Sequence, residues 1–403
     1  MNPSIQRWRS ARIQSDRLFS LLDPAALYER PIPERHRILF YLGHLEAFEW
    51  NLLRGARKPF EPAFDRLFAF GIDPVGGGLP SDRPSDWPAV DAVRTYNSRV
   101  RAALDDTESY PDLLMNVAIE HRLMHVETLS YMLHQLPPAS KRRDGTAVLT
   151  VSGPPRKSGM VEVPAGEVTL GLARDAGQFG WDNEFDAHTV TLPGFAIDRY
   201  KVTNGDYLEY VRAGGSPPVF WKRSGDEWIY RTMFEEIPLP LDWPVYVSHA
   251  NASAYARWAG KQLPIEAEWQ RAACGAPRAG NYGCERWDPV PVTAFGAGTA
   301  GAGTAATGAA ATGTAATGTA GVEDMRGNGW EWTSTLFEPF AGFEAFPFYP
   351  GYSADFFDGQ HYVMKGGSPR TAACMMRPSF RNWFQPQYPY VYAGFRCVVR
   401  DRQ

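Results

Sequence analysis

Cysteines are few in this sequence, and long apolar segments are absent. Its 403 residues include four cysteines, which form neither a C-x-x-C pair nor a spacing typical of zinc sites: Cys274, Cys284, Cys374 and Cys397. No run of about 18 apolar residues occurs, so a membrane-spanning helix is not expected. The N-terminus lacks an apolar core long enough for a signal peptide. We therefore expect a cytoplasmic protein whose thiols are reduced.

The sequence also lacks an excess of charge of either sign. Its 41 Lys and Arg residues stand against 45 Asp and Glu residues, which gives a net charge of −4. This balance provides no electrostatic basis for binding nucleic acid or an anionic membrane. The length favours two domains. The 13 tryptophans and 33 prolines indicate that one of them is rich in irregular structure and aromatic packing.

The first part of the chain, residues 1–138, has the apolar periodicity of helices. Four segments show it and are expected to form a four-helix bundle: residues 9–22, 35–53, 89–104 and 111–136. Pro111 lies where a first-turn proline is tolerated. The long loop "GIDPVGGGLPSDRPSDWP" lies between the second and third helices. A loop of this length in a compact bundle is often functional.

The rest of the chain has a different texture. Residues 139–160 have the composition of a linker. Over residues 161–403 short apolar runs alternate with Gly, Pro and Asn, and one clear helix, "HANASAYARWAGKQ", interrupts them. This pattern predicts an α+β domain with little regular structure. Residues 296–321 contain only Gly, Ala and Thr, which bury too little surface to offset the entropy of ordering. A disordered surface insert is expected there, with a flexible lid as the alternative.

Two histidines stand one helical turn apart in "EHRLMHVETLSYMLHQL", residues 120–136. The i, i+4 spacing places His121 and His125 on one face of a helix. Two imidazoles so placed can hold one transition metal. The apolar residues of the same segment leave a second interpretation open, a core helix with two hydrogen-bonded histidines. The spacing alone does not decide between them.

Six passages of the C-terminal part occur in a characteristic order: "GEVTLG", "KVTNGDYLEYV", "PVYVSHANASAYARWAGKQLPIEAEWQRAA", "VEDMRGNGWEWTS", "VMKGGS" and "GFRCVVRD". They resemble the formylglycine-generating-enzyme (sulfatase-modifying-factor) domain, a C-type-lectin-like α+β fold. The formylglycine enzymes use a pair of C-terminal cysteines with copper. Here Cys374 stands alone, and Cys397 belongs to the common "GFRC" ending, so that chemistry is not expected.

Further passages extend the resemblance to both domains: "YLGHLEAFEWNLL", "HRLMH", "FGWDNE", "AFPFYPGYSADFF" and "SFRNWFQP". With a DinB-like four-helix bundle ahead of the C-terminal domain, the chain resembles the EgtB-type sulfoxide synthases, which are non-haem iron enzymes of ergothioneine biosynthesis. The resemblance implies that His44 from one helix joins His121 and His125 from another around Fe(II). Open positions on the iron then remain for a thiolate and O2.

The same resemblance implies small-molecule substrates. The family's acceptor is hercynine (Nα-trimethylhistidine), and a C–S bond forms at its imidazole C2 while oxygen is retained as a sulfoxide. A trimethylammonium group favours aromatic faces, and the "FRNW" passage implies that Asn382 and Trp383 bind the trimethylammonium and carboxylate side. The alternative is that this passage only fills the core.

Two differences separate this chain from the branch of the family that uses γ-glutamylcysteine. Phe384 and Tyr388 stand where an Asp and an Arg would hold the dipeptide, and Met124 also replaces a common Gln. We therefore expect a different branch, with free L-cysteine as the sulfur donor. Arg83, in the long bundle loop, resembles a family arginine that binds the carboxylate of the donor.

A third departure concerns the family's catalytic tyrosine, because Phe348 stands at its position. The proton donor is expected among the neighbouring tyrosines and one on the bundle: Tyr349, Tyr352 and Tyr96. Two other functions stay open. One is a selenium-using relative that forms a C–Se bond from a seleno-sugar, and the other is a non-catalytic binding module of the same fold.

Overall fold

The computed structural model describes residues 3–54, 59–69, 79–107, 109–145, 152–154, 159–295 and 321–400. The chain divides into two compact units, Met1–Gly145 and Thr146–Gln403. The expected Gly/Ala/Thr insert falls, except for Gly321, outside the described residues. The expected domain bounds, 1–138 and 161–403, and the linker over 139–160 stay predictions.

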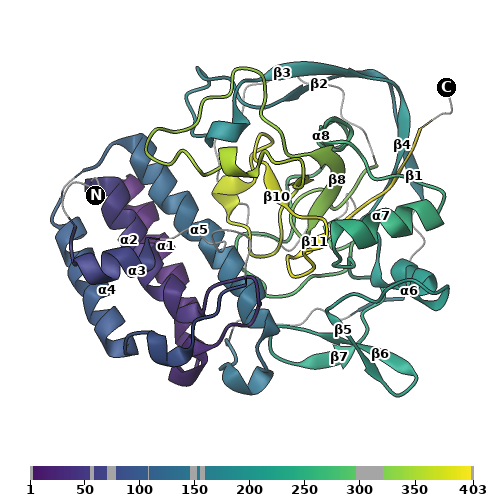
Figure 1. Ribbon diagram of the computed structural model, residues 1–403. Coiled ribbons are helices and arrows are strands. Elements are labelled where there is room, and N and C mark those ends of the chain that lie inside the picture. The colour runs from purple at the N-terminus through teal and green to yellow at the C-terminus, as the bar shows by residue number, and fades with distance from the viewer. Residues whose placement is uncertain are drawn as a thin grey trace. The chain divides into compact units, whose positions relative to one another are not determined.

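The first unit is helical, as Figure 1 shows. Its helices are α1 (Pro3–Ser20), α2 (Ile38–Arg54), α3 (Pro62–Phe68), α4 (Val90–Asp105) and α5 (Asp112–Gln135), with short 3-10 turns η1 (Pro24–Tyr28), η2 (Pro84–Asp86) and η3 (Pro138–Ser140). The four long helices are those expected from the apolar periodicity. The short helix α3 was not predicted, because seven residues are too few for a clear period. Pro111 precedes α5 as its cap residue rather than lying in the first turn.

Helix α5 is buried on almost every side because it packs against both α1 and α2. A helix of this kind must pair its polar side chains within the unit, since water does not reach them. The buried residues of α5 include charged and imidazole side chains as well as apolar ones. These polar side chains lie between helices that are distant in sequence.

The second unit is an α+β domain with short strands and long connections (Figure 1). Its largest sheet has the order β10-β9-β8-β11, and a three-stranded sheet has the order β1-β4-β12. The strands of these two sheets are β1 (Met160–Val163), β4 (Phe195–Asp198), β8 (Trp330–Leu336), β9 (Tyr362–Lys365), β10 (Asn382–Phe384), β11 (Ala393–Gly394) and β12 (Val398–Arg400). All neighbouring pairs are antiparallel except β8 and β11.

Two smaller sheets and three helices complete the part of this unit that the structure describes. The sheets are β2 (Gly166–Leu170) with β3 (His188–Leu192), and β5 (Trp221–Ser224), β6 (Glu227–Arg231) and β7 (Glu236–Pro238). The helices are α6 (Asn204–Arg212), α7 (His249–Trp258) and α8 (Glu266–Ala273), with 3-10 turns η4 (Asp182–Glu184), η5 (Ala354–Phe356) and η6 (Ala373–Met375). Only α7 was expected. Helix α6 begins at a capping box, in which Thr203 and Asp206 satisfy each other's backbone N–H groups.

A buried ion cluster links the two main sheets of the second unit. Arg396, which precedes β12, pairs with Glu331 of β8 at 2.6 Å, and Lys201 lies 3.2 Å from the same carboxylate. All three side chains are fully shielded from solvent. Because each charge has a partner, the cluster can remain ionised without water. The fold class predicted from the sequence, a helical bundle followed by an α+β domain, is confirmed.

Candidate metal centre

Three histidines of the first unit come together in its core. His44 lies on α2, and His121 and His125 lie one turn apart on α5. At most 5% of each side chain is exposed, and the candidate ligand atoms of the three rings lie within 4.8 Å of one another. The ring centroids are separated by 5.4, 5.1 and 4.5 Å. The two helices thus present three imidazole groups to one small volume.

The orientation of His44 is set by a backbone contact. Its Nδ1 lies 2.7 Å from the carbonyl oxygen of Phe68, the last residue of α3. Because a carbonyl only accepts hydrogen bonds, Nδ1 carries the proton and Nε2 carries the lone pair. Phe48 stacks on the ring of His121 at 3.4 Å and 11°, which restricts that imidazole to one plane.

Burial keeps these histidines neutral. Burial lowers the pKa of His44 to about 4, although the hydrogen bond to Phe68 acts in the opposite direction and raises it. The pKa values of His121 and His125 are lowered well below the ordinary value, first by burial and then by the neighbouring histidines. Neutral imidazole is the form that binds metals. Near neutral pH each ring therefore has a lone pair available for coordination.

The residues present fit a metal ion. Among the described residues, Nε2 of His44 and both ring nitrogens of His125 are buried with no hydrogen-bond partner. Buried polar atoms without partners cost free energy, and a cation at the centre of the group would satisfy them. Imidazole suits iron, zinc, copper and nickel. Three nitrogen donors leave further coordination positions for other ligands, an arrangement found in metal centres that act on bound small molecules.

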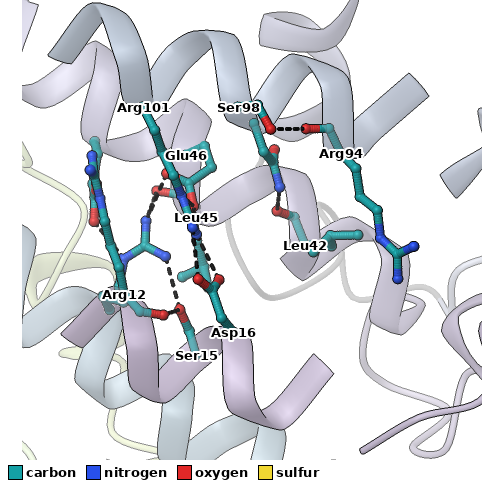
Figure 2. A network of polar contacts seen from close by, with 12 residues as sticks. Arg12, Ser15, Asp16, Leu42, Leu45, Glu46, Arg94, Ser98 and Arg101 are labelled. Atoms are coloured by element: carbon teal, nitrogen blue, oxygen red, sulfur yellow. Dashed lines mark hydrogen bonds and ion pairs between the residues drawn. The ribbon is translucent and has the colours of Figure 1, made fainter. Parts of the chain in front are cut away.

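Charged side chains lock the helices around the histidines. Arg122, next to His121, pairs with Glu49 at 2.5 Å and with Glu46 at 3.0 Å. Figure 2 shows Arg101 of α4 reaching both Glu46 of α2 and Asp16 of α1. Burial alone would raise the pKa of Glu46, but Arg122 and Arg101 lower it to about 2. The carboxylate is therefore ionised, and the network fixes α1, α2, α4 and α5 in one register.

The other two candidates of this unit lie elsewhere. Tyr96 of α4 is buried, and its hydroxyl donates a hydrogen bond of 2.8 Å to Asp65 of α3. Burial and then Asp65 raise its pKa. Arg83 is exposed beside η2, where its backbone N–H donates to Asp86. Neither contact was predicted from the sequence.

The remaining candidates form an aromatic cluster in the second unit. Trp383 of β10 stacks on Phe337 at 4.0 Å and meets Tyr352 edge-on at 5.4 Å. Tyr352 in turn stacks on Trp181 at 3.9 Å, and Tyr349 lies 5.5 Å from Tyr352. Asn382 precedes Trp383 and is half-buried. The structure thus places Tyr352 in contact with both Trp383 and Tyr349.

Sequence reasoning missed a buried carboxyl group beside this cluster. Asp182 follows Trp181 and accepts a hydrogen bond from Ser353, the neighbour of Tyr352. Burial raises the pKa of Asp182. Asn183 also donates to Ser353, at 3.0 Å. The passage "FGWDNE" supports only the family resemblance, and nothing in its spacing shows that it faces a segment some 170 residues further along the chain.

The fold and the three histidines define a class of protein, a DinB-type bundle joined to a sulfatase-modifying-factor-type domain. The chain matches the DinB superfamily over residues 7–146 and the Sulfatase-modifying factor enzyme 1-like domain over residues 149–401. Among the described residues, no helix has the length and apolar character needed to cross a membrane.

Several relatives share this organisation. The chain is 33% identical to hercynine oxygenase of Mycolicibacterium smegmatis, over 93% of this chain and 94% of that protein. It is 34% identical to hercynine oxygenase of Mycobacterium tuberculosis, over 76% and 77% of the two chains. It is 27% identical to ergothioneine biosynthesis protein 1 of Neurospora crassa, over 94% of this chain but only 56% of that protein. The chain therefore belongs to the family that joins these two domains and includes the hercynine oxygenases.

Proposed function

We propose that this protein catalyses the O2-dependent coupling of hercynine to a thiol, a step of ergothioneine biosynthesis. The observation that carries the proposal is the buried group of His44, His121 and His125. It occurs in a chain that is 33% identical to a hercynine oxygenase over 93% of its length. In the proposed reaction the imidazole C2–H and the thiol S–H are lost and a C–S bond forms. One oxygen atom remains on sulfur as a sulfoxide, and the other leaves as water.

The proposed cofactor is Fe(II), held by the three histidines. Their neutral state and the buried lone pair of His44 Nε2 support a divalent metal. Iron rather than zinc is proposed because the reaction requires redox chemistry with O2, which zinc does not supply. When bound, the iron would supply the activation of O2 and of the thiol. The protein's own part is to hold three donors in place and to leave the remaining positions accessible.

We propose that the aromatic cluster binds hercynine. A trimethylammonium group is attracted to the face of an indole ring. Phe337 stacks on Trp383, and Tyr352 and Phe356 contact the same ring. The trimethylammonium group is proposed to bind within this group of rings. The side-chain amide of Asn382 would donate to the carboxylate of hercynine. Tyr352 and Tyr349 are the proposed proton donors, since both rings belong to the same cluster.

The proposed sulfur donor is L-cysteine. Phe384 and Tyr388 stack on each other with centroids 5.1 Å apart, so this part of the second unit offers rings where a γ-glutamyl group would need charged partners. Free cysteine needs one anchored carboxylate and one anchored amine in addition to its sulfur. Arg83, exposed in the bundle loop, is proposed to bind that carboxylate.

The test is O2 consumption by the purified protein, prepared without metal and then loaded with Fe(II) or Zn(II). We expect consumption only with iron, hercynine and a thiol together. With 18O2, the product should carry one labelled oxygen by mass spectrometry. His121→Ala should abolish turnover, while His188→Ala, which alters an exposed histidine outside the group, should not. Absence of O2 uptake with every donor would overturn the proposal. Turnover with a seleno-sugar alone would replace C–S by C–Se bond formation.

A further inference from the structure

We infer that α3 is a positioning device for His44, held in place by Tyr96 and accommodated by Gly43. The inference rests on the proposed metal-binding role of the three histidines. It adds four residues to the centre that do not touch the metal: Gly43, Asp65, Phe68 and Tyr96. Each acts on the orientation of one imidazole ring. Tyr96, expected from the sequence as a proton donor, takes a positioning role here.

The first link is the hydrogen bond between His44 and the end of α3. The carbonyl of Phe68, the last residue of this helix, accepts from Nδ1 of His44 at 2.7 Å. The last carbonyls of a helix have no partner within the helix and carry partial negative charge. This acceptor therefore favours the tautomer with the proton on Nδ1. Nε2 is left as the donor atom for a metal, and metal-binding histidines commonly use such a contact to fix tautomer and ring orientation.

The second link holds α3 against α4. Asp65, in the middle of α3, is largely buried and accepts from the hydroxyl of Tyr96 at 2.8 Å. Its other carboxylate oxygen accepts from the backbone N–H of Glu61, directly before the helix, at 2.9 Å. The ring of Tyr96 also contacts Phe64 and Phe68, with centroids 5.3 and 6.1 Å away. Because α3 has only seven residues, these contacts rather than its own hydrogen bonds must keep it helical and in position.

The third link is the glycine beside the ligand. A Cβ atom at Gly43 would lie 2.3 Å from the ring of Phe68, far inside van der Waals contact. The ring of Phe68 thus occupies the space that a side chain at position 43 would fill. Two successive residues of α2 therefore contact the same residue of α3. The ring of Phe68 packs against Gly43, and the carbonyl of Phe68 accepts a hydrogen bond from His44.

The experiment compares Gly43→Ala with Gly145→Ala. The added methyl group meets nothing within 4 Å at Gly145, so the control makes the same chemical change in open space. Metal affinity is measured by anaerobic titration of metal-free protein with Co(II), whose visible absorption reports the coordinated histidines. We expect Gly43→Ala to weaken binding about 10–100-fold, as is typical for the loss of an outer contact to a ligand. Gly145→Ala should match the unaltered protein.

A second readout needs no metal. Long-range 1H–15N spectra of the histidine rings in metal-free protein report which nitrogen of His44 carries the proton. We expect the Nδ1–H form in the unaltered protein and in Gly145→Ala, and a mixture of tautomers in Gly43→Ala. Tyr96→Phe, compared with Tyr110→Phe, gives a milder change of the same kind. The hydroxyl of Tyr110 bonds a backbone carbonyl at the end of α4 instead.

The outcomes separate the two proposals. If the unaltered protein fails to bind Co(II), the proposed metal centre is wrong. If it binds Co(II), and Gly43→Ala and Tyr96→Phe retain the same affinity and the same His44 tautomer, the positioning role of α3 is wrong. If Gly43→Ala does not fold, as judged by circular dichroism, Tyr96→Phe decides alone, because it removes one hydroxyl and leaves the packing of the ring unchanged.

Discussion

Arg122 of α5 and Glu49 of α2 form an ion pair in the core of the first unit, with Nε and Oε1 2.5 Å apart and about 1% of each side chain exposed. Glu49 lies a little over one turn beyond His44, and Arg122 directly follows His121. The pair therefore fixes the register in which α2 and α5 present their histidines to each other. Arg12 of α1 reaches the second oxygen of Glu49 at 3.1 Å, so two buried guanidinium groups share this carboxylate.

Removing that carboxylate should destabilise the protein strongly. Glu49→Ala leaves Arg122 and Arg12 in the core without this partner, and breaking a buried pair typically costs about 3–5 kcal/mol. Urea denaturation followed by circular dichroism measures the loss. Arg94→Ala is the matched control, because Arg94 lies 3.9 Å from Asp91 with both side chains exposed. Such a pair contributes about 0–1 kcal/mol. Equal losses for the two variants would show that the buried pair does not hold the helices.

Part of this centre could be predicted from the sequence, because it depends only on residues close together in the chain. His121 and His125 are four residues apart, so the geometry of one helix suffices to place them together. His44 came from a resemblance, because no local rule relates it to a helix some 80 residues later. The arginine and glutamate residues around the histidines were not predicted at all. Arg122 and Glu49, for example, lie 73 residues apart in sequence, and charge pairing of this kind has no periodic pattern.

The same distinction holds for the fold. The four long helices follow from apolar periodicity over many residues, whereas α3, α6 and α8 have seven, nine and eight residues and depend on tertiary contacts. The aromatic candidates show a similar limit. Trp383 and Tyr352 were each proposed from a motif, but their edge-on contact depends on how β10 and the segment before η5 meet. Asp182 was missed because its partner Ser353 lies 171 residues away.

Iron binding should depend on each of the three histidines. We expect His44→Ala, His121→Ala and His125→Ala each to lower iron content by more than about tenfold, since the loss of even an outer contact to a ligand costs about 10–100-fold. Turnover should disappear while the helical circular dichroism spectrum persists. Iron is measured colorimetrically after anaerobic loading and gel filtration, with His188→Ala as the control. Full iron content and activity in His121→Ala would remove that residue from the proposed centre.

Stability of the second unit should decrease in mild acid because of His249. Its Nε2 lies 3.1 Å from the carbonyl oxygen of Thr333, its ring stacks on Tyr362 at 3.8 Å, and burial lowers its pKa to about 4. The folded state therefore resists protonation below the ordinary pKa of 6.5, whereas the unfolded state takes up the proton. The free energy of unfolding should fall as pH decreases from about 6.5 towards 4. The contribution of this residue is about 2 kcal/mol by pH 5.

The measurement for this residue is a difference between variants, because the histidines of the first unit titrate abnormally as well. Urea denaturation at pH 7.5 and pH 5 is compared for the unaltered protein and for His249→Gln. The variant has a group that does not titrate, so its stability should fall less over this interval, by about 2 kcal/mol. His188→Gln, at an exposed position, should behave like the unaltered protein. An identical decrease in all three proteins would contradict the role assigned to His249.

The proposed sulfur donor, L-cysteine, can be tested against γ-glutamylcysteine. The γ-glutamyl group adds a carboxylate and an ammonium at the far end of the donor. In the proposed assignment these charges would meet the stacked rings of Phe384 and Tyr388. Leaving a buried polar group without a partner costs about 1–3 kcal/mol, and more when it is charged. We therefore expect kcat/KM to be at least about tenfold higher for cysteine than for γ-glutamylcysteine, since about 1.4 kcal/mol is a factor of ten.

Arg83→Ala should raise the KM for cysteine more than it lowers kcat, because a carboxylate anchor remote from the reacting atoms contributes equally to ground and transition states. Arg94→Ala, which removes another exposed arginine of the same unit, should change neither constant. A clear preference for γ-glutamylcysteine would mean that other residues bind its distal charges, and the assignment of cysteine from Phe384 and Tyr388 would be wrong.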